Sequence, residues 1–261
     1  MALNTEYEFA VKIEKCCKYY GHIHALKEID FEVGSNEVVG LIGDNGAGKS
    51  SLIKIITGVY PPTSGNFYIK GKKIDPRSFS VKQAQNMGIA TVYQDRSLAE
   101  KQDLWRNFFI GRQITNAFGF INVKKEKAIA KEILLNTIGF RGVGITVDSK
   151  VSTLSGGERQ GIAIGRAMYF DSDLIILDEP TVALSLKEIK KVINFVEKIK
   201  ENNKASIFIS HNIADVYSVS DRFVVLDRGE VVGNIPKSDI SLKDLNTFLL
   251  DYAHRLKDED K

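Results

Sequence analysis

The sequence predicts an α/β fold: a mostly parallel sheet core with an antiparallel β subdomain and an inserted α-helical subdomain. One observation is "GDNGAGKS" at 43–50, which lies between two apolar runs and is typical of a phosphate loop that joins a buried strand to a helix. A second is a pair of short apolar runs at 174–177 and 206–210, which have the length and composition of buried parallel strands. The third is a change to helical periodicity from about 97 to 160, which indicates the insertion.

Length and composition fit one globular domain. A chain of 261 residues with 43% hydrophobic content can bury a large core. We expect a single domain over 1–261, in which 1–96 and 161–261 form the core and the β subdomain and about 97–160 forms the helical subdomain.

Charge and targeting patterns exclude some classes of function. The balance of 36 basic and 33 acidic residues is too even to indicate, by itself, nucleic acid or an anionic membrane surface as a partner. No apolar run approaches the roughly 20 residues that span a bilayer, and the acidic N-terminus does not resemble a signal peptide. We therefore expect a cytosolic protein, in which the adjacent Cys16 and Cys17 are reduced thiols on or near a strand.

The first third of the chain reads mainly as strands. Alternating residues predict strands at 9–20 and 26–33, joined by a turn at Gly21. The helix after the phosphate loop ends at Gly58, and 66–74 predicts a hairpin around Gly71. The run that follows, 88–94, predicts a buried strand that ends at Gln94.

The rest of the chain alternates helices with short strands. The helical insert places Ile129, Ile133, Leu134 and Ile138 close to one face. The helix between the two buried strands carries Ile189, Val192, Ile193, Val196 and Ile199 at helical spacing. The chain ends with a hairpin at 222–233 and a helix at 242–256.

An aromatic cluster in the insert has two interpretations. Trp105, Phe108 and Phe109 are flanked by Arg96, Arg106 and Arg112. They form either the core of the helical subdomain, with arginines that reach out to water, or a docking face for another subunit.

The residue types of the phosphate loop suit phosphate binding. Glycines let backbone N–H groups converge on phosphate oxygens, Lys49 reaches the β- and γ-phosphates, and Ser50 supplies an oxygen to Mg²⁺. The acids Asp178 and Glu179 follow a buried strand, where open α/β sheets place their ligands. Asp178 can hold Mg²⁺ through water, and Glu179 can orient the attacking water or accept its proton.

The stretch "LSGGERQ" (154–160) predicts a capped helix start that can also bind an anion. Ser155 and Glu158 have the spacing of a capping box, and Gly156 and Gly157 leave backbone donors accessible. A second anion site is unexpected in a chain whose Lys49 already holds a terminal phosphate.

Taken together, these motifs resemble those of the ATP-binding subunits of ABC transporters. The motifs of that family occur in order: the phosphate loop at 43–51, a glutamine at 94, "LSGGERQ" at 154–160, "LIILDEP" at 174–180 and a histidine at 211. The stretch from the phosphate loop to position 74 is most similar to the branch that imports monosaccharides such as ribose, xylose or fructose, and to its single-domain members. This implies a RecA-like core and a head-to-tail homodimer in which each "LSGGERQ" stretch closes on the ATP of the other subunit.

The resemblance implies a role for each matching residue, with ATP and Mg²⁺ as cofactors. Glu179, His211, Gln94 and Lys49 would be catalytic, and Ser50, Gln94 and Asp178 would hold the metal. The nucleotide would be bound by Tyr20, which stacks on adenine, by Gly43, Asp44, Asn45, Gly46, Ala47, Gly48, Lys49, Ser50 and Ser51, and in trans by Ser155, Gly156, Gly157 and Glu158.

The resemblance also implies partners and a location. The chain would bind membrane permease subunits at the cytoplasmic face of the cell membrane, would serve an extracytoplasmic sugar-binding protein indirectly, and would not bind nucleic acid. An ABC exporter ATPase, or a soluble ABC ATPase acting on DNA or ribosomes, are the alternatives. One departure is Ser185, which stands where the family usually has aspartate; we expect slower or less cooperative hydrolysis than with aspartate.

Overall fold

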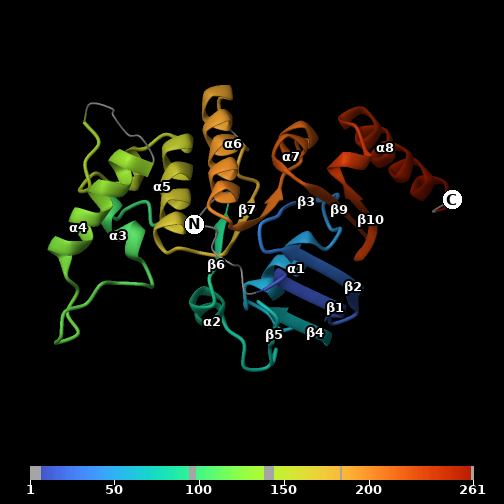
Figure 1. Cartoon of the computed structure of the whole chain (residues 1–261), viewed down its shortest axis with the longest axis horizontal. Coiled ribbons are helices and arrows are strands. Elements are labelled where there is room, and N and C mark those ends of the chain that lie inside the picture. The colour runs from blue at the N-terminus through green and yellow to red at the C-terminus, as the bar shows by residue number, and fades with distance from the viewer. Residues whose placement is uncertain (1–6, 94–97, 138–143, 183, 260–261) are drawn as a thin grey trace.

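The computed structural model describes residues 7–93, 98–137, 144–182 and 184–259. It contains a six-stranded sheet, a four-stranded antiparallel sheet and a group of helices to one side (Figure 1). The strands are β1 (Phe9–Tyr20), β2 (Ile23–Gly34), β3 (Val38–Ile42), β4 (Ser64–Ile69), β5 (Lys72–Lys73), β6 (Ile89–Tyr93), β7 (Leu174–Asp178), β8 (Ala205–Ile209), β9 (Arg222–Asp227) and β10 (Glu230–Pro236). The helices are α1 (Lys49–Ile56), α2 (Val81–Asn86), α3 (Leu104–Phe109), α4 (Val123–Glu132), α5 (Gly156–Tyr169), α6 (Leu186–Glu201), α7 (Ile213–Val219) and α8 (Leu242–Glu259), with short η1 (Ile133–Thr137), η2 (Val151–Thr153) and η3 (Lys237–Asp239).

The larger sheet has the strand order β10-β9-β3-β8-β7-β6. Every pair from β9 to β6 is parallel, and only the β9–β10 hairpin is antiparallel. All residues of β3 and β8 are buried, because both strands are internal to the sheet. On the edge strand β6, Ile89 and Val92 are buried whereas Ala90 and Thr91 are half-buried. The predicted mostly parallel core is confirmed.

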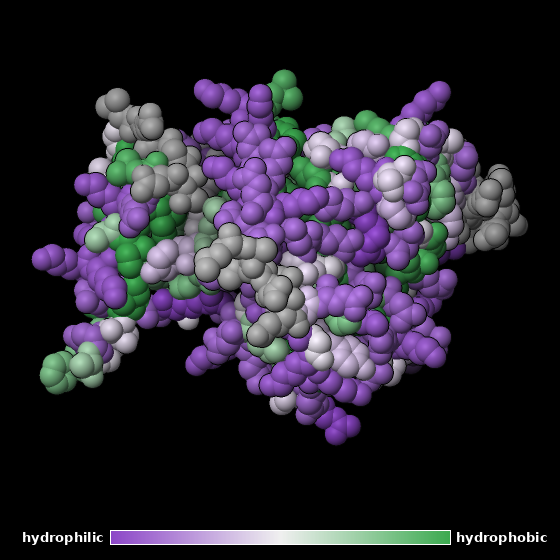
Figure 2. All heavy atoms as spheres, in the orientation of Figure 1, coloured by the Kyte–Doolittle hydropathy of each residue, from purple (hydrophilic) through white to green (hydrophobic). Residues whose placement is uncertain are grey.

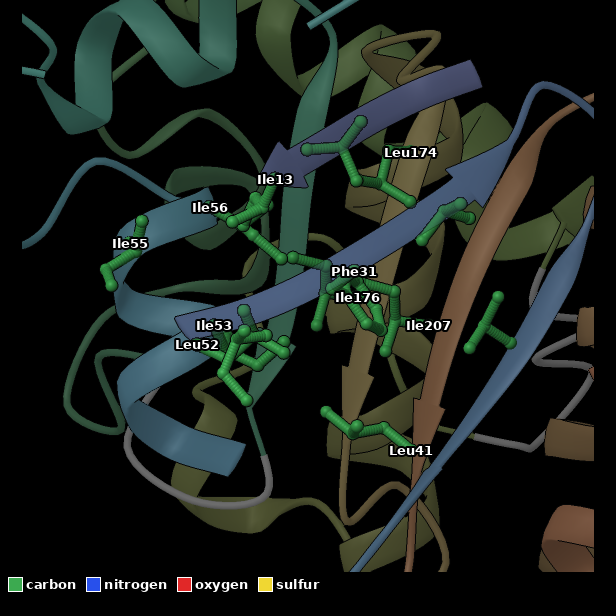
Figure 3. Packing of buried hydrophobic residues seen from close by; sticks show 14 of the residues in the cluster. Ile13, Phe31, Leu41, Leu52, Ile53, Ile55, Ile56, Leu174, Ile176 and Ile207 are labelled. Atoms are coloured by element: carbon green, nitrogen blue, oxygen red, sulfur yellow. The ribbon is translucent and has the colours of Figure 1, made fainter. Parts of the chain in front are cut away.

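Helix α1 lies between the two sheets. Its Leu52, Ile53 and Ile56 belong to one core cluster with Ile13 and Phe31 of the antiparallel sheet. Figure 3 shows these side chains directed toward residues from the larger sheet, among them Leu41, Ile176 and Ile207. The opposite face of the larger sheet packs against α5, α6, α7 and α8 in a second cluster. Burying both faces holds the strand ends, and the loops that follow them, in fixed positions.

The antiparallel sheet follows the predicted pattern. It has the order β2-β1-β4-β5, with a left-handed Gly21 between β1 and β2 and a left-handed Gly71 between β4 and β5. Cys16 and Cys17 of β1 are both free thiols, as expected, and burial raises the pKa of Cys16 to about 12. At neutral pH the buried thiol therefore stays protonated and unreactive.

The helical region has its own core, formed by α3, α4, η1 and η2 together with the start of α5. Trp105, Phe108 and Phe109 are buried in this core, so the docking interpretation of these three rings is wrong. Arg106 lies over the ring of Trp105 at 4.6 Å, which matches the arginine arrangement expected for a subdomain core. Within α5, Ile162 packs in this core and Ala163 in the cluster under the sheet, so the boundary predicted near 160 falls inside one helix.

No helix of the described segments is both long enough and apolar enough to cross a membrane.

Candidate nucleotide-binding site

The loop between β3 and α1 has a backbone that requires glycine. Gly46 and Gly48 have φ angles of +88° and +109°, in the left-handed region. A Cβ on Gly48 would lie 2.8 Å from the backbone oxygen of Ala25 and 2.8 Å from a methyl carbon of Leu26, whereas a Cβ on Gly46 would meet open space. The loop therefore lies flat against the β2 strand on one side and is open on the other.

The open side carries backbone donors. Gly48 is the N-cap of α1, and among the described residues no side chain caps this helix and no acidic residue lies in its first turn. The first N–H groups of a helix have no partner within the helix, and the helix dipole favours an anion there. Asp44, Asn45, Gly46 and Ser50 are exposed around this point. The loop thus presents the donor set of an anion site.

The Lys49 side chain donates hydrogen bonds to the backbone of its own loop. Its Nζ donates to the backbone oxygens of Gly43, at 2.5 Å, and Asp44, at 3.0 Å. Burial lowers the pKa of Lys49, while Glu179, Asp44 and Asp178 act in the opposite direction. The lysine charge is therefore near two acids that come from a distant part of the sequence.

The sheet register explains that proximity. Strand β3 pairs with β8 through Leu41 and Ile209, and Ile209 pairs in turn with Asp178 of β7. The carboxyl ends of the three parallel strands therefore meet at one edge, where β3 leads into the phosphate loop, β7 into Glu179 and β8 into His211.

Glu179 and His211 are in direct contact. Glu179 Oε2 accepts the backbone N–H of His211 at 3.3 Å, and Glu179 Oε1 lies 3.2 Å from His211 Nε2. Only 11% of the Glu179 side chain is exposed, against 56% for His211. Glu179 has a left-handed φ of +52°, which a hydrogen bond from its N–H to the Ile209 oxygen at 2.9 Å helps to hold.

Burial changes the acidity of both carboxyls. Desolvation raises the pKa of Glu179, although His211 and Lys49 lower it. Desolvation also raises the pKa of Asp178, and Lys49 is the first of the cations that lower it. A carboxyl with a raised pKa is a better proton acceptor when it is ionised, which suits Glu179 to a general base.

The oxygens at this edge fit a hard cation. Glu179 Oε1 is buried, and its contact with His211 lacks hydrogen-bond geometry, so it has no hydrogen-bond partner. Asp178 is half-buried beside it, and the Ser50 hydroxyl lies in the first turn of α1. Carboxylate and hydroxyl oxygens with room for water are the ligands that Mg²⁺ prefers.

Tyr20, at the end of β1, is 37% exposed and meets Tyr60 edge to face at 5.9 Å. Its neighbour Tyr19 stacks on His24 at 4.0 Å, so one face of Tyr19 is already covered. The Lys18 ammonium lies over the Tyr20 ring, 5.0 Å from its centroid, so each of the two rings already has a neighbour on one face, and Tyr19 is the more exposed at 45%. Gln94 lies outside the described residues, and β6 is described up to Tyr93, in register with Asp178.

The "LSGGERQ" stretch forms the predicted capping box. The Ser155 hydroxyl accepts the Glu158 N–H at 3.2 Å, and the Glu158 carboxylate accepts the Ser155 N–H at 2.8 Å. Within the described part of one chain, no hydrogen bond or ion pair joins these residues to the phosphate loop. Carboxylates of the same chain occupy this helix start: Glu158 accepts the Ser155 N–H, and Glu188 accepts the Gly157 N–H and lies 3.5 Å from the Ser155 hydroxyl.

A family model described as ABC transporter matches residues 26–182, more than half of the chain. The chain belongs to the ABC transporter family. The resemblance noted in the sequence is thereby confirmed, and so is the α/β fold.

Members of the ABC transporter family with import in their names are among its relatives. The chain is 38% identical to the xylose/arabinose import ATP-binding protein XylG of Sulfolobus acidocaldarius, over 93% of this chain and 94% of that protein. It is 35% identical to the fructose import ATP-binding protein FrcA of Rhizobium meliloti, over 89% of this chain and 90% of that protein. The ribose import ATP-binding protein RbsA of Bacillus licheniformis is also 35% identical, but the match covers 88% of this chain and only 46% of that longer protein.

Solved structures support the fold. An ATP-binding cassette of an ABC transporter in its ADP conformation superposes with a TM-score of 0.74 at 24% identity, covering 90% of this chain and 94% of that one. A dimeric ABC transporter cassette superposes with a TM-score of 0.73 at 25% identity, covering 87% and 98%.

Glu188, three residues after Ser185 at the start of α6, contacts the start of α5 as well as its own helix. Its carboxylate accepts the N–H and the hydroxyl of Ser185, at 2.9 and 2.8 Å, and also lies 3.5 Å from the Ser155 hydroxyl. Hydrogen bonds from Ser185 lower the pKa of Glu188, with smaller contributions from Gly157 and Ser155. Ser155 is 33 positions away in the sequence, so no local pattern could have predicted this contact.

Proposed function

We propose that this chain is the ATP-hydrolysing subunit of an ABC importer that takes up a monosaccharide through a membrane permease. The observation that carries the ATPase part is the edge of the larger sheet, where Lys49, Asp178, Glu179 and His211 converge. The names of the relatives support a sugar as the cargo, since the xylose/arabinose and fructose import proteins match over nearly their full lengths.

The chemistry at the site is positioning and charge neutralisation. Backbone N–H groups of 46–51 and the Lys49 ammonium bind the phosphates and stabilise the charge that develops on them. Glu179 orients the attacking water and accepts its proton, and His211, in contact with Glu179, holds the γ-phosphate end of the site. Ser50, Asp178 and Gln94 would hold Mg²⁺, which when bound would neutralise phosphate charge.

Two copies of the chain complete the site. Among the described residues, Ser155, Gly156 and Gly157 have no hydrogen bond to the phosphate loop of their own chain. The Glu188 carboxylate of the same chain lies at Ser155 and Gly157, which supports an anion site there that could take a phosphate held by a second copy. The dimeric solved cassette with the same fold also supports this arrangement. We infer that two subunits enclose two ATP molecules and that closing and reopening of this dimer drives the permease.

A cleft of about 310 Å³ is the proposed permease-docking site. It opens between the helical region and the core and is lined by Val81 and Ala84 of α2, by Arg112 and by Arg166 and Phe170 at the end of α5. Burial lowers the pKa of Arg166, whose guanidinium is anchored to the Ile110 oxygen at 2.6 Å. An apolar cleft with two fixed cations suits a short helix that carries acidic and apolar residues. This docking would place the chain at the cytoplasmic face of the membrane, where a sugar-binding protein on the other side is served indirectly.

The test is a tagged pull-down from detergent-solubilised membranes, followed by mass spectrometry and by reconstitution of the recovered complex. We expect a polytopic permease, and ATP hydrolysis that the cognate sugar and its binding protein stimulate. Recovery of ribosomes or DNA-associated proteins without a membrane protein would refute the transporter assignment. Stimulation by a compound that moves outward would replace import with export.

A further inference from the structure

Residues 113–122, which are part of the connection between α3 and α4, present two phenylalanines to solvent. Phe118 is 85% exposed and Phe120 is 72% exposed, and Ile121 beside them is 43% exposed. In Figure 2 an apolar tip protrudes at the lower left of the molecule, where Figure 1 shows this loop projecting beyond α3 and α4. Large apolar side chains gathered at one protruding tip are unusual on a soluble surface and mark a contact.

The loop is ordered, so this exposure is built into the fold. The Asn116 side-chain oxygen accepts the N–H groups of Phe118 and Phe120, at 3.0 and 3.1 Å, and the Asn116 N–H donates to the Phe120 oxygen at 2.8 Å. At the base of the loop, the buried Glu126 carboxylate accepts the N–H of Ile114 at 2.7 Å. These bonds fix the backbone of the loop, on which both rings are exposed.

The surroundings of the tip are basic. From 112 to 132 the chain has five basic and two acidic residues, and one of the acids, Glu126, is only 1% exposed. Two of the basic residues already have partners, because Lys127 is paired with Asp148 and Arg112 lies over the Phe170 ring. Lys124 and Lys125, at the start of α4 directly after the loop, are exposed. Aromatic rings with exposed lysines close behind them are complementary to the interface of a bilayer that contains anionic lipids.

The loop also starts beside the proposed permease cleft. Arg112, the residue before the loop, lines that cleft, and the cleft residue Arg166 binds the Ile110 oxygen. In Figure 1 the loop points to the same lower side of the molecule as α2, which lines the other wall of the cleft. A membrane subunit seated in the cleft therefore lies on the same side of the molecule as the tip.

We propose that the 113–122 loop is a lipid anchor: Phe118 and Phe120 enter the headgroup region of an anionic membrane, and Lys124 and Lys125 contact the lipid phosphates. This deepens the peripheral membrane location and rests on the permease docking proposed above. A protein partner fits less well, because a stable protein interface buries about 800 Å² on each side and the apex of one narrow loop is far smaller. The loop and the cleft are two binding contacts on one molecule. Once the cleft holds the permease, the loop therefore binds the nearby lipid at a high effective concentration and strengthens the attachment of the subunit to the membrane.

Tryptophan fluorescence tests the anchor directly. The single tryptophan, Trp105, is buried, with 4% of its surface exposed, so lipid should not change its emission. The variant Phe118→Trp adds a second tryptophan at the tip, and subtracting the spectrum of the unmodified protein gives its emission. With vesicles of phosphatidylcholine and phosphatidylglycerol that carry brominated acyl chains, we expect a shift of the added emission to shorter wavelength and strong quenching. Ile23→Trp is the matched control, since Ile23 is 68% exposed beside another turn and should show neither effect.

Flotation of the full chain with the same vesicles separates the contribution of the two phenylalanines to lipid binding from that of the two lysines. The double variant Phe118→Ser and Phe120→Ser should no longer float, while its ATP turnover in detergent stays unchanged. Lys124→Gln and Lys125→Gln should each weaken binding about fivefold, and added salt should do the same. If Phe118→Trp is not quenched while the pull-down still recovers a permease, the anchor is refuted and the proposed function stands. If it is quenched and the pull-down recovers ribosomes or DNA-associated proteins without a membrane protein, the anchor stands and the transporter assignment falls.

Discussion

Replacing Glu179 by glutamine tests the proposed chemistry while preserving the geometry. Glutamine has the same shape, and its amide oxygen can still accept the His211 N–H that Glu179 Oε2 accepts at 3.3 Å. It cannot accept a proton from water. General base catalysis contributes roughly 10²- to 10⁴-fold, so the barrier should rise by about 2.7–5.4 kcal/mol and turnover should fall by that factor.

The assay is phosphate release at saturating ATP and Mg²⁺, together with size-exclusion chromatography of the ATP-bound protein. Glu179→Gln should retain ATP and elute as a long-lived dimer. The control is Glu197→Gln, which removes an exposed acid from α6 far from the strand ends and should leave turnover unchanged. Turnover near that of the unmodified protein would refute the role of Glu179 as the base.

The same variant has a predicted effect on stability. Burial raises the pKa of Glu179 in the folded state above its unfolded value of about 4.3, so ionisation of this side chain costs the folded protein stability. That cost is absent below the unfolded pKa and is complete above the folded pKa. The melting temperature of the nucleotide-free Glu179→Gln protein should therefore exceed that of the unmodified protein at pH 8, and the difference should shrink as the pH approaches 4. An equal difference at both ends would refute the burial argument.

Four further predictions follow from the same structure. Lys49→Ala removes a charged donor from the phosphates and should weaken ATP binding roughly ten- to a hundredfold in a fluorescent-nucleotide titration; unchanged affinity would contradict the phosphate-loop assignment. Gly48→Ala adds a Cβ 2.8 Å from a backbone oxygen and should lower the free energy of unfolding, measured by urea titration, by about 1–3 kcal/mol. Gly46→Ala should lower it less, because Gly46 has a left-handed φ but no such contact. Ser185→Asp should raise the rate or the cooperativity of hydrolysis but lower the melting temperature, because the Glu188 carboxylate lies 2.8 Å from the Ser185 hydroxyl; no change in either kinetic property would refute the proposed role of this position. Phe108→Ala, at a fully buried ring, should cost about 3–5 kcal/mol in a urea titration, against less than about 0.5 kcal/mol for Phe118→Ala.

The elements around the site could be predicted from the sequence because their signals are local. The apolar runs at 38–42, 174–177 and 206–210 became β3, β7 and β8, since uninterrupted apolar residues are stable only in strands covered on both faces. The Ser155 capping box formed as predicted for the same reason, because its hydrogen bonds join residues three positions apart. The roles of Gln94 and Tyr20 stay predictions.

The aromatic cluster shows where local reasoning fails. Trp105, Phe108 and Phe109 fit both a core and a docking face, because an apolar stripe is the same pattern whether protein or partner covers it. Only the packing of α3 against α4 and α5 placed the rings inside. The same packing left Phe118 and Phe120 outside, on a loop that a buried acid holds in place.

By itself the sequence determined most of the strands, the phosphate loop, helices α1, α4, α6 and α8 and the capped start of α5, because periodicity, glycine conformation and capping act over a few neighbouring residues. Helices α2 and α7 were not predicted. Only the tertiary structure decided which distant groups meet: Glu179 with His211, 32 positions on, and Glu188 with Ser155, 33 positions back. It also decided the acidity of Glu179, because desolvation depends on how the strands and helices enclose a side chain. Such contacts follow from the register of the sheet and the packing of helices on it, which no short stretch of sequence encodes.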